Sequence, residues 1–414
     1  MKYIYGIDFG TTNSVLAVLD VQTREIVKVF KESSLLYFNN SKDCFTGDEA
    51  ISQYISNNMQ GRLLKSVKTL LPQSAFTFTY IYGKKYTPED LVSLILSILK
   101  SRADEFTGAD VSEVVLGRPV VFSEDPIKDA IAEKRLLNAA KKAGFEKIWF
   151  QYEPIAAGFM HEQSLDKPET VLIGDFGGGT SDFTLMRLGN KKTGFQDRRE
   201  DILNTGGLHI GGDDFDAAIM WHRLVSCFGY GLTYESFGKM LEIPVHIFRT
   251  LCQWEQMAFL KEGTLRKRLD TYYIYTNKHP SIKRLMNLID LNLGFSLFQS
   301  IEKTKISLSS NDRVHLPFDS EDIKIDEIIL QSEFNDYISK EVQQVAEFLD
   351  NFMEKQGEEV NQIDHVFLTG GSSLIEAIYE IFVKEFGAGK IKRGDNFNSV
   401  AQGLAWSYYG LASE

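Results

Sequence analysis

The stretch Gly174–Asp182, with the sequence GDFGGGTSD, constrains the fold of this chain more than any other. It follows the apolar run Thr170–Ile173 and precedes the alternating run Phe183–Leu188, which predicts a strand, a glycine turn and a second strand. Three consecutive glycines permit positive φ angles and leave main-chain N–H groups uncovered, and such a nest of amides binds anions, phosphates above all. Asp175, at the start of the turn, would repel a phosphate unless a cation such as magnesium lay between them. For this turn alone, an ordinary hairpin with a flexible tip remains the alternative.

A second copy of this pattern begins the chain. Ile4–Ile7 leads into Asp8–Ser14, with the sequence DFGTTNS, and then into the apolar run Val15–Leu19. When the two Asp-Phe-Gly triplets are aligned, both turns carry hydroxyl residues; these are Thr11 and Thr12 in the first turn and Thr180 and Ser181 in the second. Two similar hairpins, each opening its own half of the chain, predict a duplicated fold with one ligand held between the halves.

Length and composition limit the class of protein. A chain of 414 residues, 43% of them hydrophobic, is long enough to bury more than one core. The net charge of −12 argues against partners such as nucleic acid or an anionic membrane. The three cysteines lie far apart and form no CxxC pair, which favours a reducing compartment over a disulfide or metal framework. With no charged leader and no apolar run as long as a membrane span, the expected location is the cytoplasm.

Two segments interrupt the duplicated pattern and are interpreted as insertions, at about residues 31–110 and about 219–330. In the first, Gly61–Leu71 predicts a helix with Lys65 and Lys68 one turn apart, and the alternating aromatics of Phe76–Tyr82 predict a strand. The second insertion is expected to be richer in helix.

Between the insertions, β-branched content predicts a buried strand over Val114–Phe122, followed by a helix that Ser123 can cap. Glu153 stands just before Pro154, at the start of another helix. Its carboxylate can favour the helix dipole, or it can lie at the floor of a nucleotide cleft, and the sequence leaves both open.

Two further glycine runs occur in the second half of the chain. Gly206–Asp216 leads into an acidic helix start and again offers free amides. Val366–Ser373 predicts a strand and a Gly-Gly turn, followed by a helix over Leu374–Phe386, and such turns lie next to nucleotides in α/β folds. The chain contains neither GxxxxGK[ST] nor GxGxxG, so a P-loop and a Rossmann fingerprint are both excluded.

Taken in order, these motifs resemble the nucleotide-binding domain of DnaK-type heat-shock chaperones, within the actin, sugar-kinase and heat-shock ATPase superfamily. The motifs that carry the resemblance are DFGTTNS, EPIAA, GDFGGGTSD, HIGGDDFD, IEKTKISLSS and LTGGSS. The resemblance implies an α/β, actin-like fold with two duplicated lobes, residues 1–167 and 168–414, each a mixed sheet flanked by helices, and with the nucleotide in the cleft between them. The sequence ends at Glu414 without a leucine-rich linker or a β-rich peptide-binding domain, which resembles the short YegD-like branch.

The resemblance also implies a role for each motif, with ATP or ADP and magnesium as cofactors. Magnesium would be held, through water, by Asp8 and Asp175. The phosphates would be held by Gly10, Thr11, Thr12, Asn13, Gly177, Gly178, Gly179 and Thr180. The catalytic set would be Lys68, Glu153, Thr180 and Asp182. The rest of the nucleotide would be contacted by Gly211, Gly212, Asp213, Glu302, Lys305, Ser309, Gly370, Gly371 and Ser372. Ile306 and Leu374 stand where the chaperone pattern has arginines that sandwich the adenine.

Three functional hypotheses follow from the resemblance. The first is slow, magnesium-dependent ATP hydrolysis that drives a chaperone-like switch and controls a client or regulatory protein. The second is a nucleotide-binding scaffold without turnover, or a filament-forming actin-like protein. The third is a small-molecule kinase, which the chaperone-like HIGGDDFD and EKTKISLSS motifs disfavour.

Overall fold

The computed structural model describes residues 2–57, 60–123, 125–162, 165–189, 199–253, 257, 260, 263–354, 363–393 and 397–412. The chain forms two compact units. The first unit comprises Met1–Leu208, Asn351–Ser373 and Phe382–Glu414, and the second comprises His209–Asp350 and Leu374–Ile381. Among the described residues, no helix is both long and apolar enough to span a membrane.

The first unit contains a five-stranded sheet with the order β10-β9-β1-β2-β3. Its strands are β1 (Tyr3–Phe9), β2 (Asn13–Asp20), β3 (Glu25–Ser33), β9 (Glu113–Arg118) and β10 (Lys147–Tyr152). Strands β1, β2 and β3 are antiparallel neighbours, whereas β9 runs parallel to both β1 and β10. The expected strand, turn and strand around Asp8–Ser14 are therefore present, and the loop that carries this turn joins two central strands.

A second five-stranded sheet in the same unit repeats this topology, with the order β13-β12-β11-β18-β19. Its strands are β11 (Glu169–Phe176), β12 (Ser181–Leu188), β13 (Ile202–Leu208), β18 (His365–Thr369) and β19 (Ile391–Arg393). Strands β11, β12 and β13 are antiparallel neighbours, and β18 runs parallel to both β11 and β19. Because each strand has a counterpart in the first sheet, the predicted duplication is confirmed. The division into lobes at residue 167 stays a prediction.

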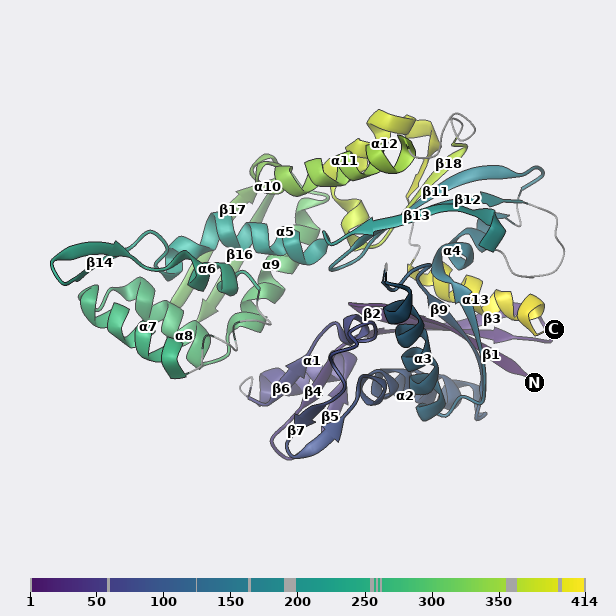
Figure 1. Ribbon diagram of the computed structural model, residues 1–414, viewed down its shortest axis with the longest axis horizontal. Helices are drawn as coiled ribbons and strands as arrows, with labels where there is room; N and C mark the ends of the chain where they lie inside the picture. The colour runs from purple at the N-terminus through teal and green to yellow at the C-terminus, as the bar shows by residue number, and fades with distance from the viewer. Residues whose placement is uncertain are drawn as a thin grey trace. The chain divides into compact units, whose positions relative to one another are not determined.

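Helices cover both faces of the first sheet. One face packs against α2 (Pro88–Thr107) and α3 (Pro126–Lys142), which bury a large apolar cluster with β1, β2 and β9. The other face packs against α13 (Phe397–Leu411), which also contacts α4 (Glu153–Glu162), and Figure 1 shows α13 in yellow beside the purple strands.

The second sheet is also covered on both faces. Ile155 of α4 packs against Val171 and Ile173 of β11 on one face. On the other face, Phe176 and Phe183 contact the Phe382 ring in α12 (Glu376–Phe386), and Phe183 contacts Phe352 in α11 (Ser339–Glu354). Helix α4, which begins with Glu153, therefore has a face on each of the two sheets.

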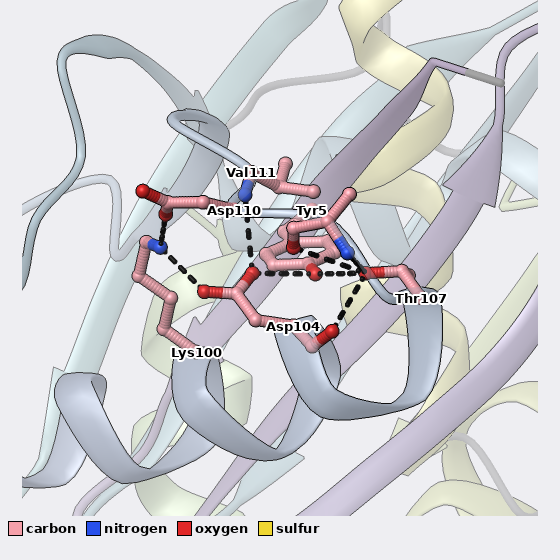
Figure 2. Close-up of polar contacts among 7 residues, drawn as sticks. Tyr5, Lys100, Asp104, Thr107, Asp110 and Val111 are labelled. Carbon is pink, nitrogen blue, oxygen red and sulfur yellow. Dashed lines mark hydrogen bonds and ion pairs between the residues drawn. The ribbon is translucent and has the colours of Figure 1, made fainter.

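A partly buried polar cluster joins β1 to the end of α2 (Figure 2). The Tyr5 hydroxyl donates to the Asp104 carboxylate at 2.9 Å, and the same carboxylate accepts from Lys100 Nζ at 2.6 Å and from the Val111 amide at 3.1 Å. Lys100 also pairs with Asp110. Since a buried polar group needs a partner, these mutual contacts fix the position of α2 against the first strand.

The segment predicted as the first insertion, about residues 31–110, contains short elements before α2. They are β4 (Leu36–Phe38), β5 (Cys44–Thr46), α1 (Gly47–Ser56), β6 (Arg62–Leu64), β7 (Thr79–Ile81) and β8 (Lys84–Tyr86). The helix predicted over Gly61–Leu71 is wrong. Arg62–Leu64 forms a strand, Ser66 has a φ of 59°, and only Val67–Leu70 forms a single 3-10 turn. The strand predicted over Phe76–Tyr82 is limited to Thr79–Ile81.

The boundaries predicted around Ser123 are also corrected. Strand β9 ends at Arg118, because Pro119 has no N–H group with which to continue the ladder. The N-cap of α3 is Asp125, whose carboxylate accepts from the Ile127 amide at 2.9 Å, and not Ser123. Asp125 precedes Pro126 at the first helical position, where a proline is well tolerated.

Among the described residues, the second unit consists of helices and two hairpins. Its helices are α5 (Gly212–Ile219), α6 (Val245–Leu251), α7 (Gly263–Tyr275), α8 (Pro280–Asp290), α9 (Gly294–Leu308), α10 (Gln331–Tyr337) and most of α11. Its hairpins pair β14 (Thr233–Ser236) with β15 (Lys239–Glu242), and β16 (Arg313–Ser320) with β17 (Ile323–Leu330). The segment from 219 to about 330 was expected to be richer in helix, and the structure adds these two hairpins to its helices.

Candidate active site

The first glycine turn, between β1 and β2, is tied to the chain that follows β3. Ser34 donates its amide to the Thr12 carbonyl at 2.7 Å and its hydroxyl to the Gly10 carbonyl at 2.8 Å. The turn at Gly10 is so tight that a Cβ atom there would lie 2.2 Å from the Asn13 carbonyl oxygen. Thr12 Oγ1 is buried and has no hydrogen-bond partner among the described residues. The turn therefore presents a hydroxyl whose hydrogen-bonding capacity is unused.

The second glycine turn joins β11 to β12, which are antiparallel as β1 and β2 are. The Gly177 amide donates to the Thr180 carbonyl at 2.9 Å, which closes the turn over Gly178 and Gly179. The Thr180 hydroxyl donates to the Asp182 carboxylate at 2.9 Å. Asp175 and Asp182 are paired in register across the two strands, so both carboxylates lie beside this turn.

Lys68 and Glu153 come together from distant parts of the sequence. Lys68 Nζ donates to Glu153 Oε1 at 2.9 Å, and the two side chains are only 15% and 16% exposed. Burial alone would lower the pKa of Lys68, but the carboxylates of Glu153 and Asp8 together raise it, so the ammonium stays charged. The charged pair joins the 3-10 turn Val67–Leu70 to the start of α4.

Asp8 lies within the same group of charges. Burial raises the pKa of the Asp8 carboxyl to about 8, the charges of Glu153 and Asp175 add to the rise, and Lys68 opposes it. Burial also raises the pKa of Asp182 to about 6, with the charge of Asp175 acting in the same direction. The Asp175 and Asp182 side chains keep contact with solvent, so water screens part of these effects.

Asp175 has a partner that the sequence interpretation missed. Thr369, at the end of β18, donates its hydroxyl to Asp175 Oδ1 at 2.8 Å. Burial raises the pKa of Asp175, while the bond from Thr369 and the charge of Lys68 oppose the rise. The signal that could have revealed Thr369 is its place next to Gly370 and Gly371 at the carboxyl end of a parallel strand.

The third glycine turn, after β18, passes close to β11. Gly370 has a φ of 82°, and a Cβ atom there would lie 2.1 Å from the Phe176 carbonyl oxygen, so this position requires glycine. Gly371 is exposed, whereas Ser372 is buried.

The remaining predicted residues lie in the second unit. Gly211 and Gly212 are buried at the start of α5, and the Gly211 amide donates to the Asp214 carboxylate at 2.8 Å. Lys305 on α9 is buried and donates to the Gly212 carbonyl at 2.8 Å and to the Asp216 carboxylate at 2.9 Å. The sequence interpretation assigned no role to Asp216, although it stands in the quoted HIGGDDFD run.

Two other predicted residues, Asp213 and Glu302, act electrostatically on Asp216. Burial raises the pKa of Asp216 to about 7, Lys305 opposes the rise, and the charges of Glu302 and Asp213 add to it. Glu302 is exposed on α9, and Ser309 is the C-cap of that helix. Ile306 and Leu374, which replace the arginines of the chaperone pattern, are 58% and 48% exposed.

The predicted residues thus form two groups. Asp8, Lys68, Glu153, Asp175 and Asp182 act on one another electrostatically within the first unit, together with the two glycine turns. The second group gathers around Lys305 in the second unit. Among the described residues, no three histidine, cysteine, aspartate or glutamate side chains are arranged to bind a metal ion directly.

Comparison with known families agrees with this arrangement. The family model described as Hsp70 protein matches residues 4–229 and 291–408, which include both five-stranded sheets and all the predicted site residues. Residues 230–290, which contain β14, β15 and α6 to α8, lie outside the match. Because the match extends over most of the chain, this protein belongs to the Hsp70 family.

Proposed function

We propose that this protein binds ATP with magnesium, hydrolyses it slowly and uses the change of nucleotide state as a chaperone-like switch. Membership of the Hsp70 family already implies ATP binding and chaperone-type ATPase activity. The observation that carries the finer proposal is the Lys68–Glu153 ion pair, held at 2.9 Å beside the carboxylates of Asp8 and Asp175. Phosphoryl transfer depends chiefly on positioning and charge neutralisation, and this group of charges can provide both.

The charge balance supports a divalent cation. Four carboxylates, those of Asp8, Glu153, Asp175 and Asp182, act on one another with Lys68 as the opposing charge. Beside burial, their repulsion raises the pKa of Asp8 to about 8, so Asp8 is fully ionised at neutral pH only when a cation is bound. The ionised carboxylates would repel a triphosphate unless that cation lay between them. Asp8 and Asp175 would hold magnesium through water molecules. When bound, the magnesium ion neutralises charge on the β- and γ-phosphates.

The protein groups around the phosphates would have distinct tasks. The unpaired Thr12 hydroxyl and the main-chain amides of the two glycine turns would donate to phosphate oxygens. The ammonium of Lys68 would neutralise charge on the γ-phosphate. Glu153 and Asp182 would orient the attacking water, and the bond from Thr180 keeps the Asp182 carboxylate in place.

The second-unit group would contact the adenosine. Lys305 is held by Asp216 and the Gly212 carbonyl, so its ammonium is already oriented on the buried face of α9. Glu302 and Ser309 lie three residues before and four residues after it, which places all three on one helix face. Gly370, Gly371 and Ser372 would border the base.

The test is single-turnover ATP hydrolysis with magnesium, with nucleotide binding measured in parallel by thermal shift. We expect Lys68→Ala to abolish hydrolysis while ATP binding survives. Lys65→Ala, a change of the neighbouring lysine in the same loop, serves as the matched control and should hydrolyse ATP at the wild-type rate.

Other results would redirect the proposal. Binding without hydrolysis by the wild type would reject turnover and identify a nucleotide-binding scaffold, for which nucleotide-dependent sedimentation would reveal filaments. Phosphate transfer to an added small molecule would indicate a kinase. Absence of ATP binding would overturn the site assignment altogether.

A further inference from the structure

One arginine on α3 holds the loop that carries Lys68. Arg135 Nη1 donates to the carbonyls of Leu70, Leu71 and Gln73, each at 3.0 Å, and Nη2 donates to the Phe76 carbonyl at 3.0 Å. The Arg135 side chain is only 11% exposed. A single guanidinium thus binds four main-chain carbonyls within seven residues of one loop.

The chain needs such a partner at this point. The 3-10 turn Val67–Leu70 ends with carbonyls that have no continuing helix to accept from, and a cation is favourable at the carboxyl end of a helical turn. From Leu71 to Phe78 the chain forms neither helix nor strand. The Leu70 and Gln73 carbonyls also accept from the Gln73 and Phe76 amides, at 3.3 and 3.0 Å. The planar guanidinium adds a second bond to each of these two and also binds the Leu71 and Phe76 carbonyls.

The connection from Arg135 to Lys68 consists of two hydrogen bonds. The Leu71 carbonyl accepts from Arg135, and the Leu71 amide donates to the Lys68 carbonyl at 3.1 Å. Val67 and Leu71 are buried on either side of Lys68 and anchor the turn in the first core. A shift of Leu71 would therefore move Lys68 relative to Glu153.

We infer that Arg135 is a positioning residue, which holds the Val67–Phe76 loop so that Lys68 reaches Glu153. Within the described part of the chain, Arg135 forms no hydrogen bond or ion pair with Lys68 or Glu153, so its effect passes through the main chain at Leu71. The inference deepens the proposed function, and the effect of Arg135 on catalysis rests on that function. The effect of Arg135 on the Lys68–Glu153 ion pair can be tested without ATP hydrolysis.

The experiment compares the full-length wild type with Arg135→Ala and Arg135→Lys. The first readout is the acylation rate of Lys68 by an amine-reactive ester, followed by mass spectrometry, which reports the ion pair whether or not ATP is hydrolysed. We expect Arg135→Ala to label faster at Lys68, because the amine is no longer held against Glu153. Arg135→Lys should fall between them, since one ammonium cannot reproduce the planar fork.

The second readout is single-turnover hydrolysis together with ATP affinity. Misplacement of a catalytic group by about 1 Å can cost roughly a hundredfold in rate. We therefore expect Arg135→Ala to lose at least about tenfold in rate while the Kd for ATP stays nearly unchanged. Guanidinium ion, added far below denaturing concentrations, should restore part of the rate, whereas sodium chloride at the same concentration should not.

A matched control separates positioning from general stability. Arg223 also bonds two carboxylates and a carbonyl, those of Glu327, Glu333 and Ile328, but it lies in the second unit. Arg223→Ala should lower the melting temperature without changing Lys68 labelling.

The inference would be overturned if Arg135→Ala kept the wild-type labelling rate at Lys68 and the wild-type hydrolysis rate. It would also be overturned if the hydrolysis rate fell only in parallel with stability and ATP affinity. A wild type without hydrolysis would reject the proposed function, and the labelling result would still decide the inference.

Discussion

Gly117 in β9 makes room for Glu153. A Cβ atom at this position would lie 3.0 Å from Glu153 Cγ and 2.9 Å from Leu404 Cδ1, both tighter than normal contact. We expect Gly117→Ala to displace the Glu153 side chain from Lys68 and to slow single-turnover hydrolysis by about tenfold or more. ATP affinity should change little, because Gly117 is not among the proposed nucleotide contacts.

The control for this substitution is another glycine in the same unit. A Cβ atom at Gly389 would meet no atom within 4 Å, and Gly389 is not among the residues with positive φ. Gly389→Ala should therefore keep the wild-type rate. Equal rates for the two variants would mean that Glu153 tolerates the added methyl group or does not contribute to hydrolysis.

At the scale of elements, the contact between Tyr5 of β1 and Asp104 of α2 predicts a pH dependence of stability (Figure 2). Burial raises the pKa of the Tyr5 hydroxyl above its ordinary value near 10. The unfolded chain therefore loses this proton first as the pH rises. The contribution of Tyr5 to the free energy of unfolding is complete below pH ~10 and declines above it by about 1.4 kcal/mol per pH unit.

Comparison with Tyr5→Phe isolates this effect. At neutral pH the variant should be less stable by about 1 kcal/mol, the usual worth of one hydrogen bond, because Asp104 still accepts from Lys100 and Val111. Phenylalanine cannot ionise, so urea denaturation at increasing pH should show the difference shrinking above pH ~10 and changing sign near pH ~11. A difference that stays constant at high pH would contradict the prediction.

The tip of the β14–β15 hairpin is strained. Phe237 and Gly238 connect paired residues Ser236 and Lys239, and both have positive φ, 50° and 73°. Asn-Gly is the preferred pair for such a turn, whereas a bulky residue in the left-handed region costs about 1 kcal/mol. Because the Phe237 side chain is fully exposed, replacing it removes no buried contact.

Phe237→Asn should therefore raise the free energy of unfolding by about 0.5–1 kcal/mol in urea denaturation. Phe237→Ala removes the same ring but keeps a side chain unsuited to positive φ, so it should have a smaller effect. If the two variants were equally stabilised, exposure of the ring, and not the backbone, would be the cause.

The elements that the sequence predicted well are those whose determinants are local. The two Asp-Phe-Gly turns lie between apolar runs, and the structure forms strands on both sides of each. The helix predicted over Gly61–Leu71 failed because both ends of the segment have distant partners: Arg62–Leu64 pairs with β4, and the Leu70 and Leu71 carbonyls accept from Arg135. Helical spacing of Lys65 and Lys68 could not reveal that contact.

At the scale of the whole molecule, most residues of the candidate site were predicted from the family resemblance. The residues that hold them in place became visible only in the structure. Lys68 and Glu153 are 85 positions apart, and no local pattern predicts their ion pair. Thr369, Asp216 and Gly117 were missed because their importance lies in contacts across the fold. Such contacts form only when segments far apart in the sequence pack together.

The proposed nucleotide contacts are divided between the two compact units. Asp8, Lys68 and the first three glycine turns belong to the first unit, and Gly211, Glu302 and Lys305 belong to the second. A ligand that binds only the folded state stabilises it by about 2.7 kcal/mol at a hundred times its Kd. If one ATP molecule contacts both groups, it should therefore protect both units against unfolding.

Hydrogen exchange in moderate urea, with peptides from each unit followed separately, tests this expectation. Magnesium and ATP should slow exchange both in β11 and β12 and in α9. Glu302→Ala changes an exposed side chain, so it should leave exchange without nucleotide unaltered but weaken the protection of α9. Lys303→Ala, at the next exposed position of the same helix, should keep full protection. Protection confined to the first unit would show that Glu302 and Lys305 do not contact the nucleotide, and it would reduce the binding site to the phosphate turns and the charges around Lys68.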